Sequence, residues 1–308
     1  MNSINNFNDI FIMGIGGSGM SSIAKYLKQK GHNVEGYDQR ASYVTNLLEN
    51  DGVKTYQNIE NYKYKEDVLY IFSSAINLND TFLYKFQNND NVLSRPEFLT
   101  ALSNEVNVIG VTGTHGKTST TALISHIFHF NGKNVSYIYG GVSGFGNLGG
   151  HYGDSDLPLI LETDEAFNTF QYIKIQDLVV TNIDNDHLDF YKSMDNLVSA
   201  FHNVIKNTLG SKILNFNDEN LACMDLKNII SYSSSNSSDY IVKFPNILLH
   251  DNKEYSIKTS LLGDHYLLNI AAAISLCNIY GISIDDSLNA ISEFSGVKRR
   301  MEYIGSYN

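Results

Sequence analysis

Gly110-Val-Thr-Gly-Thr-His-Gly-Lys-Thr118 ends an apolar, strand-like segment at 106–111 and opens a helix-like run at 117–130. Many proteins hold nucleotide phosphates with a strand, a glycine-rich turn and a helix that begins with Lys-Thr, because backbone N–H groups and the helix N-terminus surround the anion. We expect Lys117, on an exposed loop, to reach the outer phosphates and the Thr118 hydroxyl to bind Mg²⁺. The strict pattern has a glycine at the position of Val111, so a plain strand-to-helix turn is the alternative.

Composition is that of an ordinary soluble globular protein, with 43% hydrophobic and 18% charged residues. The 308 residues suffice for about two domains. A net charge of −11 argues against a nucleic-acid partner, because binding to a phosphate backbone depends on Lys and Arg. Cys223 and Cys277 indicate neither a disulfide framework nor a metal site, and the sequence shows no membrane-spanning run or signal peptide. We therefore predict a cytoplasmic protein without a membrane or nucleic-acid partner, and composition indicates no oligomeric state.

Apolar periodicity predicts α/β architecture along the chain. In the first third, strand signals at 9–13, 33–37 and 67–72 alternate with helix signals at 21–30 and 96–102. The middle region repeats this alternation, with strands at 135–139, 157–161, 178–181 and 212–216 and helices at 194–206, 269–280 and 285–294. Short β segments are expected within 230–262. The predicted fold is an N-terminal Rossmann-like parallel-sheet domain followed by a P-loop-type α/β domain.

A second glycine-rich turn, Gly14-Ile-Gly-Gly-Ser-Gly-Met20, follows the first predicted strand. It satisfies the dinucleotide pattern G-x-G-x-x-G, and Asp38 lies 19 residues after Gly19, close to where such folds place a ribose-binding acid. Alone, this turn indicates NAD or a simple packing turn. Together with the loop at 110–118, it argues against a simple dehydrogenase and predicts two phosphorylated ligands.

Polar side chains follow two further strand signals. Glu162-Thr-Asp-Glu165 comes after the strand at 157–161, and Thr181-Asn-Ile-Asp-Asn-Asp-His-Leu-Asp189 comes after the strand at 178–181. Both should lie at the sheet edge that carries the phosphate loop. One glutamate together with Thr118 suffices for Mg²⁺, and a neutral His187 is suited to a second metal ion. A solvated acidic loop and a structural histidine are the alternatives.

These motifs together resemble the Mur ligases. The family's central domain carries, in this order, G-T-H-G-K-T, E-x-D-E, T-N-I-x-x-D-H-x-D, G-x-H-x-x-x-N and G-V-K-R-R, which this chain has at 113–118, 162–165, 181–189, 263–269 and 296–300. The glycine turn and Ser-Ser-Ala-Ile at 73–76 resemble the branch that ligates L-alanine to UDP-N-acetylmuramate. The murein-peptide ligase relative, which adds a whole peptide to the same sugar nucleotide, is less similar because its glycine turn differs.

The resemblance implies an ATP-dependent ligase of peptidoglycan precursor synthesis that joins L-alanine to the carboxylate of UDP-N-acetylmuramate through an acyl phosphate. It implies that Lys117, Glu162 and His187 are catalytic, that Thr118 and Glu162 hold one Mg²⁺, and that His187 holds a second. ATP would contact Gly113, Thr114, His115, Gly116, Lys117, Thr118, Ser119 and Arg300, with His265 and Asn269 beside the adenine. The UDP-sugar would contact Gly14, Gly16, Gly17, Ser18, Gly19, Met20, Asp38, Ser73 and Ser74.

The resemblance also implies domain boundaries and shows departures. Residues 1–105 would form the UDP-sugar-binding domain and 106–300 the ATP-binding domain, while 301–308 would begin a third, absent domain that binds the amino acid. Family members usually have Asn where this chain has Tyr266, and a polar Asp in the segment where it has Ala166-Phe167. Because the third domain is expected to be missing, a non-catalytic nucleotide- or UDP-sugar-binding homologue is the rival interpretation. An NAD-dependent oxidoreductase is a more distant one.

Overall fold

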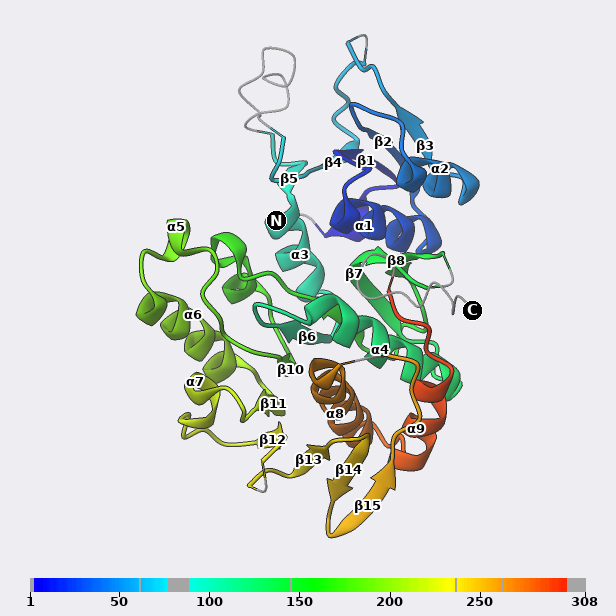
Figure 1. The fold of residues 1–308 in the computed structure, drawn as a ribbon. Coiled ribbons are helices and arrows are strands. Elements are labelled where there is room, and N and C mark those ends of the chain that lie inside the picture. Colours follow the sequence, from blue (N-terminus) through cyan, green and yellow to red (C-terminus); the bar gives the residue numbers. More distant parts are fainter. Residues whose placement is uncertain are drawn as a thin grey trace.

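The computed structural model describes residues 3–60, 62–76, 89–144, 146–235, 237–261 and 263–297. These residues build two sheets, and the N-terminal one lies at the top of Figure 1. Arg300 and the segment 301–308, for which the sequence predicts an ATP contact and the start of a third domain, lie outside the described residues. No helix in the described ranges is both long enough and apolar enough to cross a membrane.

The N-terminal sheet has five strands in the order β3-β2-β1-β4-β5, and every neighbouring pair is parallel. The strands are β1 (Asp9–Met13), β2 (Asn33–Tyr37), β3 (Lys54–Tyr56), β4 (Val68–Phe72) and β5 (Val92–Ser94), and a 3-10 turn (Ile4–Asn6) precedes them. Their helices are α1 (Ser18–Gln29), α2 (Tyr43–Asn50) and α3 (Arg95–Ser103). Ser42 and Ser94 start α2 and α3 with capping boxes, which satisfy backbone amides of the first turn.

The second sheet has ten strands in the order β15-β14-β13-β12-β11-β10-β6-β9-β7-β8. Its centre, from β13 to β7, is parallel, and antiparallel pairs lie at both ends. The strands are β6 (Val108–Thr112), β7 (Ser136–Val142), β8 (Leu148–His151), β9 (Leu159–Glu162), β10 (Asp177–Val180), β11 (Lys212–Asn215), β12 (Ile229–Ser233), β13 (Tyr240–Lys243), β14 (Ile247–His250) and β15 (Lys253–Ser256). Two mainly parallel sheets confirm the predicted α/β class.

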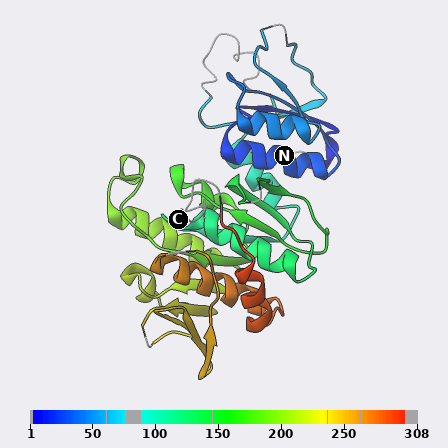
Figure 2. The same ribbon diagram turned by 45° about the vertical axis from the view of Figure 1, so that its right-hand side comes forward.

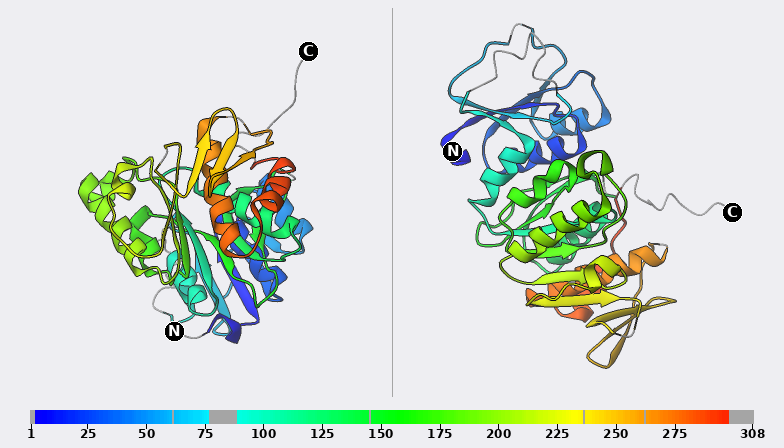
Figure 3. Two further views of the ribbon diagram at one scale, coloured as in Figure 1. Left: turned by 90° about the horizontal axis from the view of Figure 1, so that it is seen from below. Right: turned by 90° about the vertical axis from the view of Figure 1, so that its left-hand side faces the viewer.

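Helices cover both faces of the ten-stranded sheet (Figure 3). One layer contains α4 (Lys117–Phe130), α8 (Asp264–Ile279) and α9 (Ile284–Ser292), and the other contains α6 (Met194–Asn207) and a 3-10 helix (Ala166–Tyr172). Neighbouring residues of β6 separate accordingly, because Ile109 and Val111 pack into the first core and Val108 into the second. The short helices α5 (Leu188–Tyr191) and α7 (Glu219–Ala222) follow β10 and β11.

Helix α1 joins the two parts of the molecule (Figure 2). It covers the five-stranded sheet and also contacts β7 and β8 of the ten-stranded sheet. The Ser22 hydroxyl donates a hydrogen bond to the Tyr139 carbonyl (2.7 Å). One apolar cluster continues across this contact, from Ile12 in β1 to Leu148 in β8. The two parts are therefore packed against each other over a shared core.

We expect Gly150→Ala to lower the free energy of unfolding by about 1–3 kcal/mol, because overpacking a close contact forces the backbone to move. A Cβ at position 150 would lie 1.9 Å from the Ser22 carbonyl oxygen, so α1 would have to move away from β8. Urea unfolding followed by circular dichroism measures the loss. Asn147→Ala, at an exposed position before the same strand, is the control. Equal stability of both variants would show that α1 and β8 are not this close in solution.

Candidate functional site

Three loops meet at one edge of the ten-stranded sheet because β6 lies between β9 and β10. Both neighbours run parallel to β6, with Glu162 opposite Val111 and Val180 opposite Thr112. The loop after β6 therefore lies between the segments that follow β9 and β10. Ligands of open parallel sheets bind at the carboxyl ends of the strands, where the strand order changes direction. The structure thus brings together the three polar segments that the sequence singles out.

The loop between β6 and α4 contains two glycines with positive φ and is held by the segment after β10. Gly113 (φ 133°) lies so close to Thr181 that a Cβ would come within 2.1 Å of its hydroxyl oxygen. Gly116 (φ 83°) forms the N-cap of α4. The Thr114 amide donates a hydrogen bond to the Asn182 carbonyl (3.0 Å). Contacts with Thr181 and Asn182, in the segment after β10, therefore fix the conformation of this loop.

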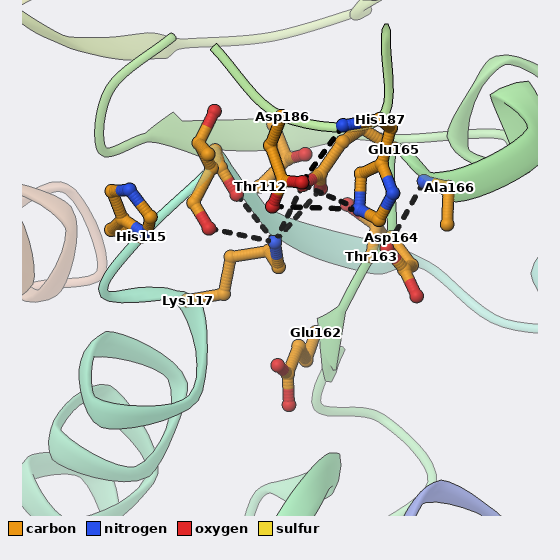
Figure 4. Close-up of polar contacts among 12 residues, drawn as sticks. Thr112, His115, Lys117, Glu162, Thr163, Asp164, Glu165, Ala166, Asp186 and His187 are labelled. Carbon is orange, nitrogen blue, oxygen red and sulfur yellow. Dashed lines mark hydrogen bonds and ion pairs between the residues drawn. The ribbon is translucent and has the colours of Figure 1, made fainter. Parts of the chain in front are cut away.

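Lys117, the first residue of α4, is largely buried, because only 14% of its side chain is accessible, and the expectation of an exposed loop is wrong. Its Nζ donates to the Gly113 carbonyl (2.6 Å) and to both carboxylate oxygens of Glu165 (2.9 and 2.8 Å), as Figure 4 shows. The Glu165 side chain is 1% exposed. Burial raises the pKa of this carboxyl above its ordinary value, and the Lys117 ammonium opposes the rise. A buried carboxylate thus holds the lysine of the phosphate loop.

Thr118 and Glu162 form a separate polar pair. The Thr118 hydroxyl donates a hydrogen bond to Glu162 Oε1 (2.7 Å), and the Gly140 amide donates to Glu162 Oε2 (2.5 Å). These two contacts fix the carboxylate beside the first turn of α4. A hydroxyl and a carboxylate in contact are hard oxygen donors of the kind that Mg²⁺ takes, together with waters and phosphate oxygens.

His187 belongs to a different group of potential metal ligands. It starts α5 in a left-handed backbone conformation (φ 55°), and its Nε2 lies 3.7 Å from Glu165 Oε1. One ligand atom each from Asp164, Glu165 and His187 lies within 4.8 Å of the others. The Glu162 side chain points away from this group in Figure 4. The structure therefore divides the predicted metal residues into Thr118 with Glu162, and His187 with two other acids.

The glycine turn of the N-terminal part connects β1 to α1, as the sequence predicts. Gly14 (φ 78°) packs against Ser73, and Gly17 is the N-cap of α1. Asp38 is not free to face a ligand with its whole carboxylate, because its Oδ2 accepts a hydrogen bond from the Gly16 amide (2.9 Å). The acid predicted to contact a sugar nucleotide therefore also holds the turn in place.

A cavity of about 280 Å³ extends from this turn to the phosphate loop. The N-terminal part lines it with residues 17–20, Ser73, Ser74 and Arg95. The middle part contributes Thr118, Gly140, Glu162 and Asp164. A second cavity, of about 260 Å³, is lined by residues 103–108 and Leu209 among others and contains none of the predicted site residues. A ligand in the first cavity would touch both parts of the chain and reach the Thr118–Glu162 pair.

The residues predicted to lie beside an adenine occupy the first two turns of α8. Asn269 is 8% exposed and lies against the phosphate loop, where a Cβ at Gly116 would come within 2.9 Å of its Oδ1. His265 is exposed. Tyr266, which stands where the family usually has Asn, is 4% exposed and belongs to the core that includes α8. Tyr266 therefore adds to the core, and of the two predicted adenine contacts only Asn269 is shown to lie beside the loop.

Three residues at this site have no distinguishing signal in the sequence. Arg95 is a basic residue directly before the predicted helix at 96–102, as surface arginines often are. Glu165 lies in an acidic segment, but only the fold shows that it pairs with Lys117. Gly140 contributes a backbone amide, which no side-chain pattern reveals.

The chain is similar to known proteins in sequence and in fold. Residues 9–106 match the Mur ligase family, catalytic domain, and residues 168–277 match the Mur ligase middle domain. The chain is 30% identical to the UDP-N-acetylmuramate–L-alanine ligase of Cytophaga hutchinsonii over an alignment that covers 98% of this chain and 69% of that protein.

Two solved structures have the same fold. The UDP-N-acetylmuramate–alanine ligase of Thermotoga maritima superimposes with a TM-score of 0.83 at 25% identity, covering 96% of this chain and 70% of the other. The UDP-N-acetylmuramate:L-alanyl-gamma-D-glutamyl-meso-diaminopimelate ligase of Neisseria meningitides gives a TM-score of 0.81 at 21% identity, covering 95% of this chain and 100% of the other. The second likeness concerns the fold alone.

Proposed function

The chain belongs to the Mur ligase family, and on this basis we propose that it is an ATP-dependent amide-bond ligase that joins L-alanine to the carboxylate of UDP-N-acetylmuramate. The observation that carries the proposal is the cavity between the glycine turn and the Thr118–Glu162 pair. A sugar nucleotide bound at the turn would present its carboxylate to nucleotide phosphates bound at the second loop. Such a cavity is what a reaction between two phosphorylated ligands requires.

The UDP-sugar is assigned to residues 1–105 and ATP to residues 106–300. Lys117 and the amides of 113–118 would hold the outer phosphates of ATP, and the first turn of α1 would hold the diphosphate of the sugar nucleotide. Glycine-rich turns before helices favour anions in both places, because backbone N–H groups converge there. Backbone donors also explain how a protein with a net charge of −11 would bind two anionic ligands.

The proposed reaction has two steps. A carboxylate oxygen of UDP-N-acetylmuramate attacks the γ-phosphorus of ATP, ADP leaves, and an acyl phosphate forms. The amine of L-alanine then attacks the acyl carbon, phosphate leaves, and the amine nitrogen loses a proton as the amide forms. The first step brings two anions together, so the protein contributes mainly by positioning them and by placing positive charge beside the phosphates. Lys117 is the residue that supplies this charge from α4.

We further propose that Thr118 and Glu162 hold the Mg²⁺ of ATP and that His187 holds a second Mg²⁺. The donor chemistry fits, because a hydroxyl and a carboxylate oxygen lie 2.7 Å apart in one group and two acids accompany the imidazole in the other. Bound Mg²⁺ would reduce the repulsion between the carboxylate and the phosphoryl group. A cytoplasmic location, where ATP is supplied, belongs to the same proposal.

Trapping the acyl phosphate tests this function directly. The protein is incubated with ATP, Mg²⁺, UDP-N-acetylmuramate and hydroxylamine, and mass spectrometry should find the hydroxamate of the sugar nucleotide. No hydroxamate should form without ATP. Replacing hydroxylamine with L-alanine or with the L-alanyl-γ-D-glutamyl-meso-diaminopimelate peptide then separates two ligase reactions. Preference for the peptide would favour the murein-peptide alternative, and ADP release without any acyl product would contradict both.

We expect UDP-N-acetylmuramate to bind at least about 10-fold more tightly than NAD, a difference of about 1.4 kcal/mol. The reason is that Asp38, at the position of a ribose-binding acid, already accepts a hydrogen bond from Gly16, while the cavity leads from the turn to a second phosphate site. Isothermal titration calorimetry of the protein with each ligand measures the ratio. Tighter binding of NAD would contradict this expectation and indicate that the glycine turn binds a dinucleotide.

A further inference from the structure

We propose that Arg95 binds the carboxylate of UDP-N-acetylmuramate and thereby selects this sugar nucleotide over sugar nucleotides without a carboxylate. The inference rests on the proposed function and names the residue that decides which substrate is used.

Arg95 is held at the boundary between the two parts of the molecule. It is the first residue of α3, which leads from the five-stranded sheet toward β6. The capping box of Ser94 and Glu97 fixes this helix start. The guanidinium lies over Gly19 in the first turn of α1, where a Cβ would come within 3.1 Å of Arg95 Nε and 3.3 Å of Nη2. The glycine at position 19 therefore provides the space through which the arginine reaches the cavity.

The guanidinium has few partners of its own. Its Nη1 lies 3.9 Å from Asp164 Oδ2, which is beyond hydrogen-bond distance, and its Nε is buried without a hydrogen-bond partner. In the described part of the chain this ion pair is the one polar interaction found for Arg95. A guanidinium carries several N–H donors, and buried donors are nearly always satisfied in proteins. A ligand could supply an acceptor for the guanidinium N–H donors that have no partner in the protein, since 25% of the Arg95 side chain remains accessible.

Charge in the cavity favours a carboxylate as that ligand group. Among the described residues that line the cavity, Arg95 is the only cationic side chain, and Glu162 and Asp164 are acidic. A substrate carboxylate that approaches the phosphate loop along this wall would be repelled by both acids. The guanidinium fork matches a carboxylate with two parallel hydrogen bonds, and Arg95 already faces the carboxylate of Asp164. The substrate carboxylate would take the place of Asp164.

The diphosphate of the same ligand has other donors. The amides of Gly17 and its neighbours lie at the N-terminus of α1, a 12-residue helix, and suit a phosphate without any side-chain cation. Loss of Arg95 should therefore affect the carboxylate and leave the UDP moiety bound. This difference separates selection of the carboxylate from general attraction of anions.

Calorimetry with three ligands tests the proposal, in the absence of ATP and metal. Arg95→Ala should weaken binding of UDP-N-acetylmuramate by about 10- to 100-fold, as for loss of a charge-assisted pair. Binding of UDP and of UDP-N-acetylglucosamine, which lacks the lactyl carboxylate, should stay within about twofold, a difference below 0.5 kcal/mol. Arg95→Lys keeps the charge without the fork and should give an intermediate loss.

Two further variants distinguish binding from a structural role. If Arg95 only ties the two parts together through Asp164, then Asp164→Asn should lose as much affinity as Arg95→Ala. The proposal instead expects Asp164→Asn to bind UDP-N-acetylmuramate as tightly as the wild type or more tightly. Lys25→Ala is the matched control, because it removes a charge of α1 that pairs with Asp51 at 3.4 Å outside the cavity. Thermal unfolding of each variant confirms that it is folded.

Three results would overturn the proposal. They are an equal loss for all three ligands in Arg95→Ala, no loss for UDP-N-acetylmuramate, or the same loss in Asp164→Asn. Each of them leaves binding of UDP-N-acetylmuramate to the wild type intact. Failure of the wild type to bind any UDP-sugar is a different result, which would remove the proposed function together with this inference.

Discussion

Lys117→Ala is expected to weaken binding of ATP·Mg²⁺ by about 10- to 150-fold, because a charge-assisted contact to phosphate contributes about 1.5–3 kcal/mol. Lys117 Nζ is held at the phosphate loop by the Gly113 carbonyl and by Glu165. Its loss removes the positive charge that α4 directs toward the loop. Calorimetry of the variant with ATP·Mg²⁺ measures the change, and Lys227→Ala, at an exposed position, is the control.

The same substitution should also destabilise the protein. Glu165 is 1% exposed, and without Lys117 its charge would be buried and unpaired, which typically costs about 3–5 kcal/mol. The double variant Lys117→Ala/Glu165→Gln removes that charge, so we expect it to recover most of the stability and none of the ATP affinity. Lys117→Arg keeps the charge. Wild-type ATP affinity in a folded Lys117→Ala protein would contradict the assignment of the phosphate loop.

Much of the fold could be predicted because the central strands carry strong local signals. Residues 108–111 (Val-Ile-Gly-Val) and 178–180 (Leu-Val-Val) carry no polar side chain, and every residue of β6 and β10 is buried, as expected for parallel strands that are buried on both faces. Each is followed by polar residues, and parallel strands place their carboxyl ends at one edge. The convergence of the three polar segments could therefore be predicted from the order of apolar and polar runs alone.

The short edge elements could not be predicted in this way. Strand β8 has the sequence Leu148-Gly-Gly-His151, which shows no alternation of apolar and polar residues. It pairs with β7, and Gly150 allows α1 to pack closely against it, although the residues of α1 lie more than a hundred positions away in the sequence. Helix α8 begins at Asp264, earlier than the predicted 269, after a glycine with φ 106° that makes no side-chain cap. Long-range pairing and packing decide the first of these features.

Within the site, spacing identifies the acidic segment without saying which acid does what. Glu162 contacts Thr118, whereas Glu165 turns to Lys117 and Asp164 to Arg95. These directions depend on how the chain leaves β9 and enters a 3-10 helix. The sequence could therefore predict a group of carboxylates at the phosphate loop, and only the fold separates them into a partner of Thr118, a partner of Lys117 and a partner of Arg95.

That separation leads to the prediction for the two proposed metal groups. Glu162→Gln should lower the rate of acyl phosphate formation by about 100-fold or more. A cation that polarises a phosphoryl group stabilises the transition state by several kcal/mol, and each 1.36 kcal/mol corresponds to about a tenfold change in rate. It should also raise the Mg²⁺ concentration needed for tight ATP binding, since Mg²⁺ would lose its carboxylate ligand beside Thr118. Asp154→Asn, an exposed acid that accepts a hydrogen bond from Asn134, is the control.

His187→Ala should behave differently, because His187 lies with Asp164 and Glu165 rather than with Glu162. We expect it to leave the Mg²⁺ dependence of ATP binding near that of the wild type. Only the rate of the step that needs UDP-N-acetylmuramate should fall. Titrating Mg²⁺ into each variant with ATP, and then measuring hydroxamate formation, separates the two effects. If both substitutions shift the Mg²⁺ dependence of ATP binding equally, the two groups act as one metal site and the division seen in the side-chain contacts does not persist when the nucleotide is bound.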